Sequence, residues 1–230
     1  MVDVADNYKN IRSRMAEAAA KAGRDVDEVR LLAASKAQSV TALRAALAAG
    51  VTLVGENYVQ EALAKKQQLT EPAEWHMIGH LQRNKAKVAV ELFDLIESLD
   101  SIALARELDK EGRKRGKPIR AFVEVNLAGE ESKSGVAKAA VVSLMETVAG
   151  LSYLSVEGLM TVPPYRENLE TARPYFRELR ALKEQLNALR LPNVVLKELS
   201  MGMTHDYTVA IEEGATIVRI GTALFGPRKA

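Results

Sequence analysis

The most informative segment of this sequence reads Val29-Arg30-Leu31-Leu32-Ala33-Ala34-Ser35-Lys36. An apolar run of this length without alternation is typical of a fully buried strand of a parallel sheet. Lys36 then stands at the carboxyl end of that strand, where α/β sheets hold their ligands. Burial there favours the neutral amine, which is a nucleophile toward carbonyl groups. The alternative is a surface lysine that opens a loop.

Strand-like and helix-like segments alternate along the rest of the chain. Strands are expected at 29–36, 51–54, 75–78, 92–97, 120–126, 154–160, 194–200 and 216–220. Helices are expected at about 6–22, at 40–49, after Ser101 and around 176–189. Gly23 and Gly50 are predicted to end the first two helices, and Ser101 to cap the third.

Eight strands alternating with helices in 230 residues indicate a parallel sheet. Eight is the number at which a (β/α)₈ barrel closes. We therefore predict an α/β fold: one TIM-like (β/α)₈ barrel domain over residues 1–230, with an extra N-terminal helix. The alternative is an open, doubly wound sheet.

The composition narrows the classes of function. The chain is 47% hydrophobic and 27% charged, with a net charge of +2, so nothing suggests an electrostatic nucleic-acid binder. It has no cysteine, which excludes disulfides and thiolate metal sites and is compatible with a cytoplasmic location. No segment resembles a signal peptide or a membrane span, so we expect no membrane partner.

Two glycine-containing segments near the end of the chain predict a phosphate site. They are 199–203, Leu-Ser-Met-Gly-Met, and 218–222, Val-Arg-Ile-Gly-Thr. The last two βα loops of such barrels often bind phosphate through backbone amides, and Ser200, Gly202, Gly221 and Thr222 suit that use. The alternative is that the two glycines only form turns. A reactive lysine together with a phosphate site suggests a phosphorylated aldehyde.

Other polar residues are also expected at strand ends, namely Asn57, His80, Asn126 and Arg219. His76 and His80 are four residues apart, which in a strand is about 13 Å, too far to share one metal ion. We therefore predict no metal site. Glu124 is either a buried acid or an ion-pair partner inside the barrel, and Trp75 is expected in the core.

Seven ordered motifs resemble a known family. They are Leu31–Lys36, Gly55–Glu61, Trp75–Gln82, Val125–Leu127 with Glu131–Gly135, Gly158–Met160, Leu199–Met203, and Val218–Thr222 with Phe225-Gly226. Together they resemble the pyridoxal phosphate homeostasis proteins, single-domain relatives of the alanine racemase barrel. The resemblance covers about Leu31 to Pro227.

The resemblance implies a cofactor and the residues that hold it. The cofactor is pyridoxal 5′-phosphate, bound as an imine by the lysine that matches Lys36. Residues matching Ser200, Gly221 and Thr222 contact its phosphate, and Met201 and Gly202 belong to the same loop. The asparagine matching Asn57 lies beside the cofactor, and the arginine matching Arg219 faces its pyridine nitrogen.

The resemblance further implies binding and delivery of this cofactor, without catalytic turnover. A cation such as Arg219 disfavours the protonated pyridine nitrogen that carbanion chemistry uses. Only Ala223–Ala230 follow the last predicted strand, which is too short for a second domain. We expect a monomer whose partners are pyridoxal phosphate and apo pyridoxal-dependent enzymes.

Two alternatives remain from other classes. One is a racemase-like pyridoxal enzyme with Lys36 as a base, and the other is a sugar-phosphate aldolase. The chain departs from the family pattern at Arg83, where a small polar residue is expected, and at Thr204-His205-Asp206, where Ser-x-Asp is usual. Thr204 preserves the hydroxyl group.

Overall fold

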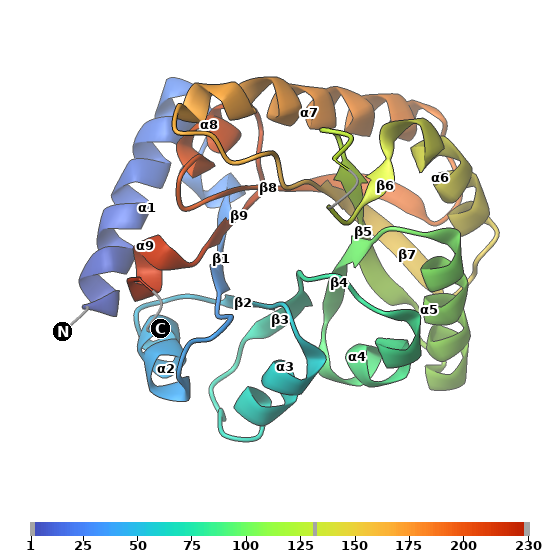
Figure 1. Ribbon diagram of the computed structural model, residues 1–230, viewed down its shortest axis with the longest axis horizontal. Helices are drawn as coiled ribbons and strands as arrows, with labels where there is room; N and C mark the ends of the chain where they lie inside the picture. The colour runs from blue at the N-terminus through green and yellow to red at the C-terminus, as the bar shows by residue number, and fades with distance from the viewer. Residues whose placement is uncertain (1–2, 131–132, 228–230) are drawn as a thin grey trace.

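Eight parallel strands form a closed ring at the centre of the molecule, and helices surround it (Figure 1). The computed structural model describes residues 3–130 and 133–227. Glu131 and Ser132, from one of the motifs above, and the last three residues of the predicted domain lie outside the described part.

The elements follow one another in the expected alternation. The strands are β1 Arg30–Ala34, β2 Leu53–Glu56, β3 Glu74–Met77, β4 Leu95–Leu99, β5 Ile119–Asn126, β6 Val136–Ala137, β7 Leu154–Met160, β8 Val194–Met203 and β9 Ile217–Ile220. The helices are α1 Val4–Lys21, α2 Val40–Ala48, α3 Val59–Lys66, α4 Ala86–Leu92, α5 Ile102–Arg115, α6 Val141–Ala149, α7 Arg173–Ala188, α8 Tyr207–Glu212 and α9 Thr222–Phe225.

The ring closes through a pairing between β4 and β5. The remaining order is β4-β3-β2-β1-β9-β8-β7-β5, and every neighbouring pair is parallel. Closure confirms the predicted barrel and excludes the open sheet. The two-residue strand β6 pairs only with β5 outside the ring and was not predicted.

Several strand boundaries differ from the prediction. β1 ends two residues before Lys36, although Ser35 N–H still donates to the Gly55 carbonyl. The strand expected at 51–54 instead covers 53–56. The strand expected at 92–97 begins at Leu95, because α4 continues to Leu92 and buries Ala86, Ala89 and Val90.

Ser101 caps its helix as predicted, and Gly23 and Gly50 lie just after α1 and α2 with positive φ. The Asp3 side chain accepts hydrogen bonds from the first turn of α1, and the Ser101 hydroxyl accepts from Leu104 N–H in α5. Gly116 ends α5 in the left-handed conformation, at φ 65°. The basic residues 113–115 lie in the last turn of α5, where they complement the helix dipole. The predicted N-terminal helix is α1.

Two apolar clusters form the core. The smaller fills the barrel with Leu32, Leu53, Leu95, Phe122, Met160 and Ile217. The larger lies between the ring and the helices and includes Trp75, as predicted. The smaller cluster shows which residues of each strand face inward, and this defines the site below. No helix in the described part of the chain is long and apolar enough to cross a membrane.

Candidate functional site

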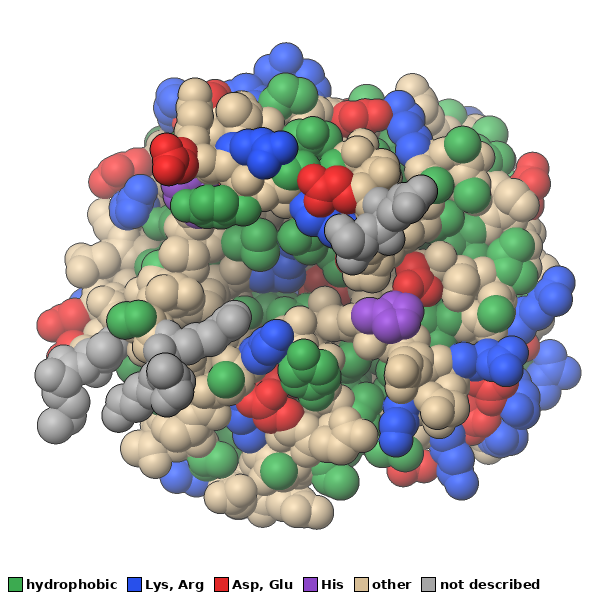
Figure 2. Space-filling model, in the orientation of Figure 1, with side chains coloured by type: hydrophobic (Ala, Val, Ile, Leu, Met, Phe, Trp, Pro, Cys, Tyr) green, Lys and Arg blue, Asp and Glu red, His purple; other side chains and the backbone are tan. Residues whose placement is uncertain are grey.

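Strand alternation brings most of the predicted site residues to one end of the barrel. Side chains two residues apart point to the same side of a strand. Leu32 and Leu53 face inward. Lys36 and Asn57 each follow one of them by four positions, so alternation continued beyond the strand ends gives both side chains that side. Ile217 likewise gives Arg219 and Gly221 the inward side. Figure 2 shows this face hollowed at its centre, with basic side chains in and around the hollow.

Lys36 is half-buried and directly follows β1. Its ammonium lies 5.1 Å from the centre of the Tyr58 ring. Ala37, the next residue, has φ 60° and donates its N–H to Glu61 over 2.6 Å. The left-handed residue turns the chain away immediately after Lys36, so this lysine stands at the corner of a loop whose backbone is tied to α3.

A buried ion cluster supports this loop from behind. Lys65 of α3 donates to the Ser35 carbonyl over 2.5 Å and to Glu61 over 2.8 Å, and it also contacts the carboxylate of Glu56. The Ser35 hydroxyl donates to the same carboxylate over 2.5 Å. Burial raises the pKa of Glu56, and Lys65 opposes that shift. The backbone one residue before Lys36 is thus fixed by a charged group that the sequence did not reveal.

Arg219 of β9 is buried and donates two hydrogen bonds to neighbouring strands. Its Nη1 donates to the Ser200 hydroxyl over 2.7 Å, and its Nη2 donates to the Thr161 carbonyl over 2.8 Å. The Ser200 hydroxyl in turn donates to Glu97 over 2.5 Å. Burial lowers the pKa of Arg219, and the nearby carboxylates oppose that shift.

This arrangement bears on the predicted phosphate contact of Ser200, which stays a prediction. Ser200 was predicted to contact a phosphate, but its hydroxyl is fully buried and bridges Glu97 and Arg219. A phosphate could reach it only by breaking that bridge. Met201, its neighbour, packs its side chain in the outer core, so only its backbone could contact a ligand.

The polar chain continues through the middle of the barrel to His76. Glu97 lies 2.6 Å from Nδ1 of His76, and Nε2 lies 3.2 Å from Glu74 without the alignment of a hydrogen bond. Burial lowers the pKa of His76, but the two carboxylates outweigh it and raise the pKa to about 9. Contact with His76 holds the pKa of Glu74 at about 2. A charged imidazolium therefore lies between two carboxylates inside the barrel.

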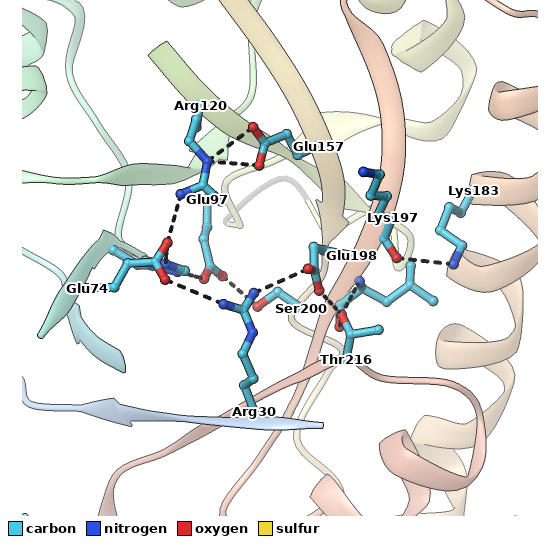
Figure 3. A network of polar contacts seen from close by, with 12 residues as sticks. Arg30, Glu74, Glu97, Arg120, Glu157, Lys183, Lys197, Glu198, Ser200 and Thr216 are labelled. Carbon is cyan, nitrogen blue, oxygen red and sulfur yellow. Dashed lines mark hydrogen bonds and ion pairs between the residues drawn. The ribbon is translucent and has the colours of Figure 1, made fainter. Parts of the chain in front are cut away.

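This row of polar side chains ends at the opposite, N-terminal end of the barrel (Figure 3). Arg120 donates to Glu74 over 2.8 Å and to Glu157 over 2.9 Å. Arg30 contacts Glu74 at 3.4 Å and Glu198 at 3.3 Å. A cavity of about 680 Å³ opens here, but its arginines are paired and it lies at the wrong end of the barrel for Lys36. We therefore do not assign the ligand site to it.

The loops after β8 and β9 form a cradle at the C-terminal end. Gly202 has φ 89°, and a Cβ atom there would lie 2.5 Å from the Cβ of Ala210, so only glycine fits. Thr204 accepts a hydrogen bond from Ala223 N–H over 3.2 Å, which ties the two loops together. Gly221 and the exposed Thr222 begin α9 beside this contact. Thr204, two residues after Gly202, thus links this loop to the start of α9, where Gly221 and Thr222 lie.

Acidic groups line another part of the same end. Glu124 of β5 is buried and forms no ion pair within residues 3–130 and 133–227. Of the two predicted roles, buried acid or ion-pair partner, the structure therefore shows the buried acid. The exposed His80 contacts Asp100 at 2.9 Å. A cavity of about 380 Å³ opens between Asn57, Tyr58 and His80. Asn126 instead shapes its own loop, accepting from Gly129 and donating to the Glu130 carbonyl.

The two departures from the family pattern have different settings. Arg83 is exposed and begins a short 3₁₀ turn before α4. The ring of His205 lies 5.2 Å from that of Tyr165, and its Nε2 is 3.0 Å from the Glu167 carbonyl. Neither side chain contacts Lys36 or Arg219 in the described part of the structure.

The residues at this end fit a phosphorylated pyridine aldehyde. Lys36 offers an amine for the aldehyde, Arg219 a buried cation, and Gly202 and Gly221 a backbone cradle with adjoining threonine hydroxyls for the phosphate. The crowding at Gly202 comes from Ala210 and Tyr207 of α8 and fixes the path of this loop. The fit rests on Lys36 at the end of β1 and on Gly221 and Thr222 at the start of α9, at the same end of the barrel.

Comparison with known proteins gives the same result. A family model described as the alanine racemase N-terminal domain matches residues 5–229. A protein of Aquifex aeolicus (strain VF5), named pyridoxal phosphate homeostasis protein, is 45% identical over 99% of this chain and 100% of its own length. A Pseudomonas aeruginosa protein of the same name is 42% identical over 99% of this chain and 97% of its own.

Solved structures extend the comparison. PipY of Synechococcus elongatus PCC7942, with pyridoxal phosphate bound, is 36% identical, with a TM-score of 0.85 over 97% of this chain and 100% of that one. An alanine racemase of Clostridium difficile 630 shares the fold at 14% identity, with a TM-score of 0.76, and 57% of its chain is covered. These matches define a barrel of the alanine racemase N-terminal class. Within that class, the chain belongs to the pyridoxal phosphate homeostasis protein family.

Proposed function

We propose that this protein binds pyridoxal 5′-phosphate as an imine of Lys36 and takes part in its intracellular homeostasis and delivery. The observation that carries the proposal is the joint placement of Lys36, Arg219 and the Gly202–Gly221 cradle at one end of the barrel. The pyridoxal phosphate bound to PipY, a relative at 36% identity, supports it.

Each predicted residue has a part in this proposal. Lys36 carries the cofactor, and Asn57 lies beside it. The backbone around Met201, Gly202 and Gly221 and the hydroxyls of Thr204 and Thr222 hold the phosphate. Arg219 faces the pyridine nitrogen, and Ser200 positions Arg219 instead of contacting the phosphate.

Binding without turnover is the second part of the proposal. Arg219 donates to Ser200 and Thr161, and the carboxylate of Glu97 lies beyond Ser200, so the guanidinium, which stays charged in proteins, is fixed in place. A fixed cation disfavours protonation of the pyridine nitrogen and weakens the electron sink that amino-acid chemistry uses. The names of the relatives, which are homeostasis proteins, support this view. A cytoplasmic location and a monomeric state stay predictions from the sequence.

A racemase-like pyridoxal enzyme is the competing function, and one experiment separates the two. The loaded protein is incubated with an apo pyridoxal enzyme, beside an equal concentration of free cofactor, and in parallel with alanine in deuterated water. We expect the apo enzyme to gain activity while alanine keeps its α-hydrogen. Lys36-dependent exchange at roughly 1 per second or faster would show an enzyme instead.

A further inference from the structure

The carboxyl group of Glu124 has no role in the site described so far. It lies near the end of β5, two residues beyond Phe122, which faces the barrel interior, and it is only 5% exposed. Its Oε1 accepts a hydrogen bond from the Ser134 hydroxyl over 3.0 Å. Its Oε2 has no hydrogen-bond partner among the residues that the structure describes. A buried oxygen left unsatisfied is costly and indicates a missing partner.

The charged groups Arg219, Asp100 and His80 surround Glu124 and affect its carboxyl group. Thr161, which accepts from Arg219, donates its own hydroxyl to the Val125 carbonyl, so the Arg219 guanidinium lies close to this end of β5. Asp100 and His80 lie on the side of β3 and β4. Burial raises the pKa of Glu124, with the Ser134 hydrogen bond and the Arg219 charge opposing it, so its carboxylate is a stronger base than an exposed one.

We propose that Glu124 receives the primary ammonium group of a lysine side chain that takes over the cofactor, and accepts one of its protons. This inference rests on the proposed function. It identifies the acceptor chemically, as a side-chain amine that replaces Lys36 on the aldehyde carbon.

The exchange balances in protons and bonds. Two N–H bonds of the incoming ammonium break: one proton goes to Oε2 of Glu124 and the other to Nζ of Lys36. The imine nitrogen carries a proton before and after the exchange. The incoming nitrogen forms a C=N double bond to the aldehyde carbon as the C=N double bond from that carbon to Nζ breaks. Lys36 leaves as a neutral amine, and the total charge is conserved.

A side-chain amine suits this site better than a free amino acid. Asp100 and Glu124 both disfavour an α-carboxylate nearby. The cavity of about 380 Å³ beside Tyr58 and His80 opens at the same end of the barrel, and its volume gives an aliphatic side chain room to approach. Lys85 also lines that cavity and could favour a carboxylate, so a free amino acid is included in the test.

The test compares three amines on the loaded protein, following loss of the cofactor from Lys36 by absorption. Nα-acetyl-lysine methylamide represents a lysine side chain, alanine a free amino acid, and O-methylhydroxylamine an amine already neutral at pH 7. Glu124→Gln keeps the size and the Ser134 contact but removes the proton acceptor. Glu157→Gln, the same change at the other end of the barrel, is the control.

We expect Glu124→Gln to slow the acetyl-lysine reaction about a hundredfold, the scale of one general base. The reaction of Glu124→Gln with O-methylhydroxylamine should keep the wild-type rate. The reactions of Glu157→Gln with acetyl-lysine methylamide and with O-methylhydroxylamine should also keep it. Equal slowing of both amines by Glu124→Gln, no slowing at all, or a faster wild-type reaction with alanine than with acetyl-lysine methylamide would overturn the inference. A wild-type protein with no cofactor on Lys36 would instead refute the proposed function.

A second measurement needs neither the variant nor the cofactor. Carbon-13 NMR of the Glu124 carboxyl in the unloaded protein should shift when Nα-acetyl-lysine methylamide is added, and should not shift with its neutral analogue Nα-acetyl-norleucine methylamide. Absence of an amine-dependent shift would contradict an ammonium site at Glu124.

Discussion

The guanidinium of Arg219 donates to the hydroxyl of Ser200 over 2.7 Å, and both side chains are buried inside the barrel. The same hydroxyl donates to Glu97 over 2.5 Å. Ser200 therefore joins a cation to a carboxylate in the buried interior, and its loss would leave both partly unsatisfied. This relationship changes what a Ser200 variant should do.

Ser200→Ala should destabilise the fold and weaken the binding of pyridoxal phosphate and of unphosphorylated pyridoxal equally. We expect the free energy of unfolding in urea to fall by about 1–3 kcal/mol, the cost of unsatisfied buried polar groups. Titration with pyridoxal phosphate and with pyridoxal should show the same loss of affinity for both. A larger loss for the phosphorylated ligand would mean that Ser200 contacts the phosphate directly.

Unlike Ser200, Thr222 should affect the binding of the phosphorylated ligand only. Thr222→Val keeps the shape and removes the hydroxyl that we assign to the phosphate, so affinity for pyridoxal phosphate should fall by about 1.5–3 kcal/mol. Affinity for pyridoxal should hardly change. Thr52→Val at the N-terminal cavity is the matched control and should leave both affinities as they are. An unselective loss in Thr222→Val would remove the hydroxyl from the phosphate site.

His76 should make stability depend on alkaline pH. Its pKa is about 9 in the folded protein, above the 6.5 of a free histidine. The stabilisation is therefore complete below pH 6.5 and is lost as the pH rises through 9, by on the order of 3 kcal/mol. Urea unfolding at pH 6.5 and 9.5 should show this difference in the wild type and a smaller one in His76→Gln.

The control for His76 is the exposed His80, whose change to Gln should leave the pH dependence intact. Nitrogen-15 NMR of the His76 ring gives the direct readout. A neutral imidazole at pH 7 would contradict the charged chain through the barrel.

Lys65 should be needed for the loop that carries Lys36. Lys65→Met removes the cation from the buried Glu56 carboxylate, and we expect a loss of about 3–5 kcal/mol in unfolding free energy. The double variant Lys65→Met/Glu56→Gln should recover part of that loss, because no buried charge remains unpaired. Additive losses in this double-mutant cycle would show that the two side chains do not depend on each other.

The barrel and the strand-end residues could be predicted because they depend on local pattern. Apolar runs separated by helix signals defined the eight strands, and alternation determined the side on which Lys36, Asn57 and Arg219 lie. Boundaries shifted where a helix continued into an apolar segment, as α4 does to Leu92.

Contacts between distant strands could not be predicted from local pattern. Ser200 meets Glu97 across 103 positions of sequence, and nothing near either residue indicates that partner. The same holds for Lys65, an ordinary helix lysine by its neighbours, which the fold buries against Glu56. The role of Ser200 therefore became clear only when the strands were placed around the ring.

The central claim is that Lys36 carries pyridoxal phosphate, and peptide mapping after borohydride reduction tests it most directly. The freshly loaded protein is reduced, digested and analysed by mass spectrometry, beside Lys36→Ala treated in the same way. We predict one pyridoxyl phosphate adduct, on the peptide containing Lys36, and none in the variant, which should remain folded. An adduct on another lysine of the wild type, or an undiminished adduct in Lys36→Ala, would contradict the account.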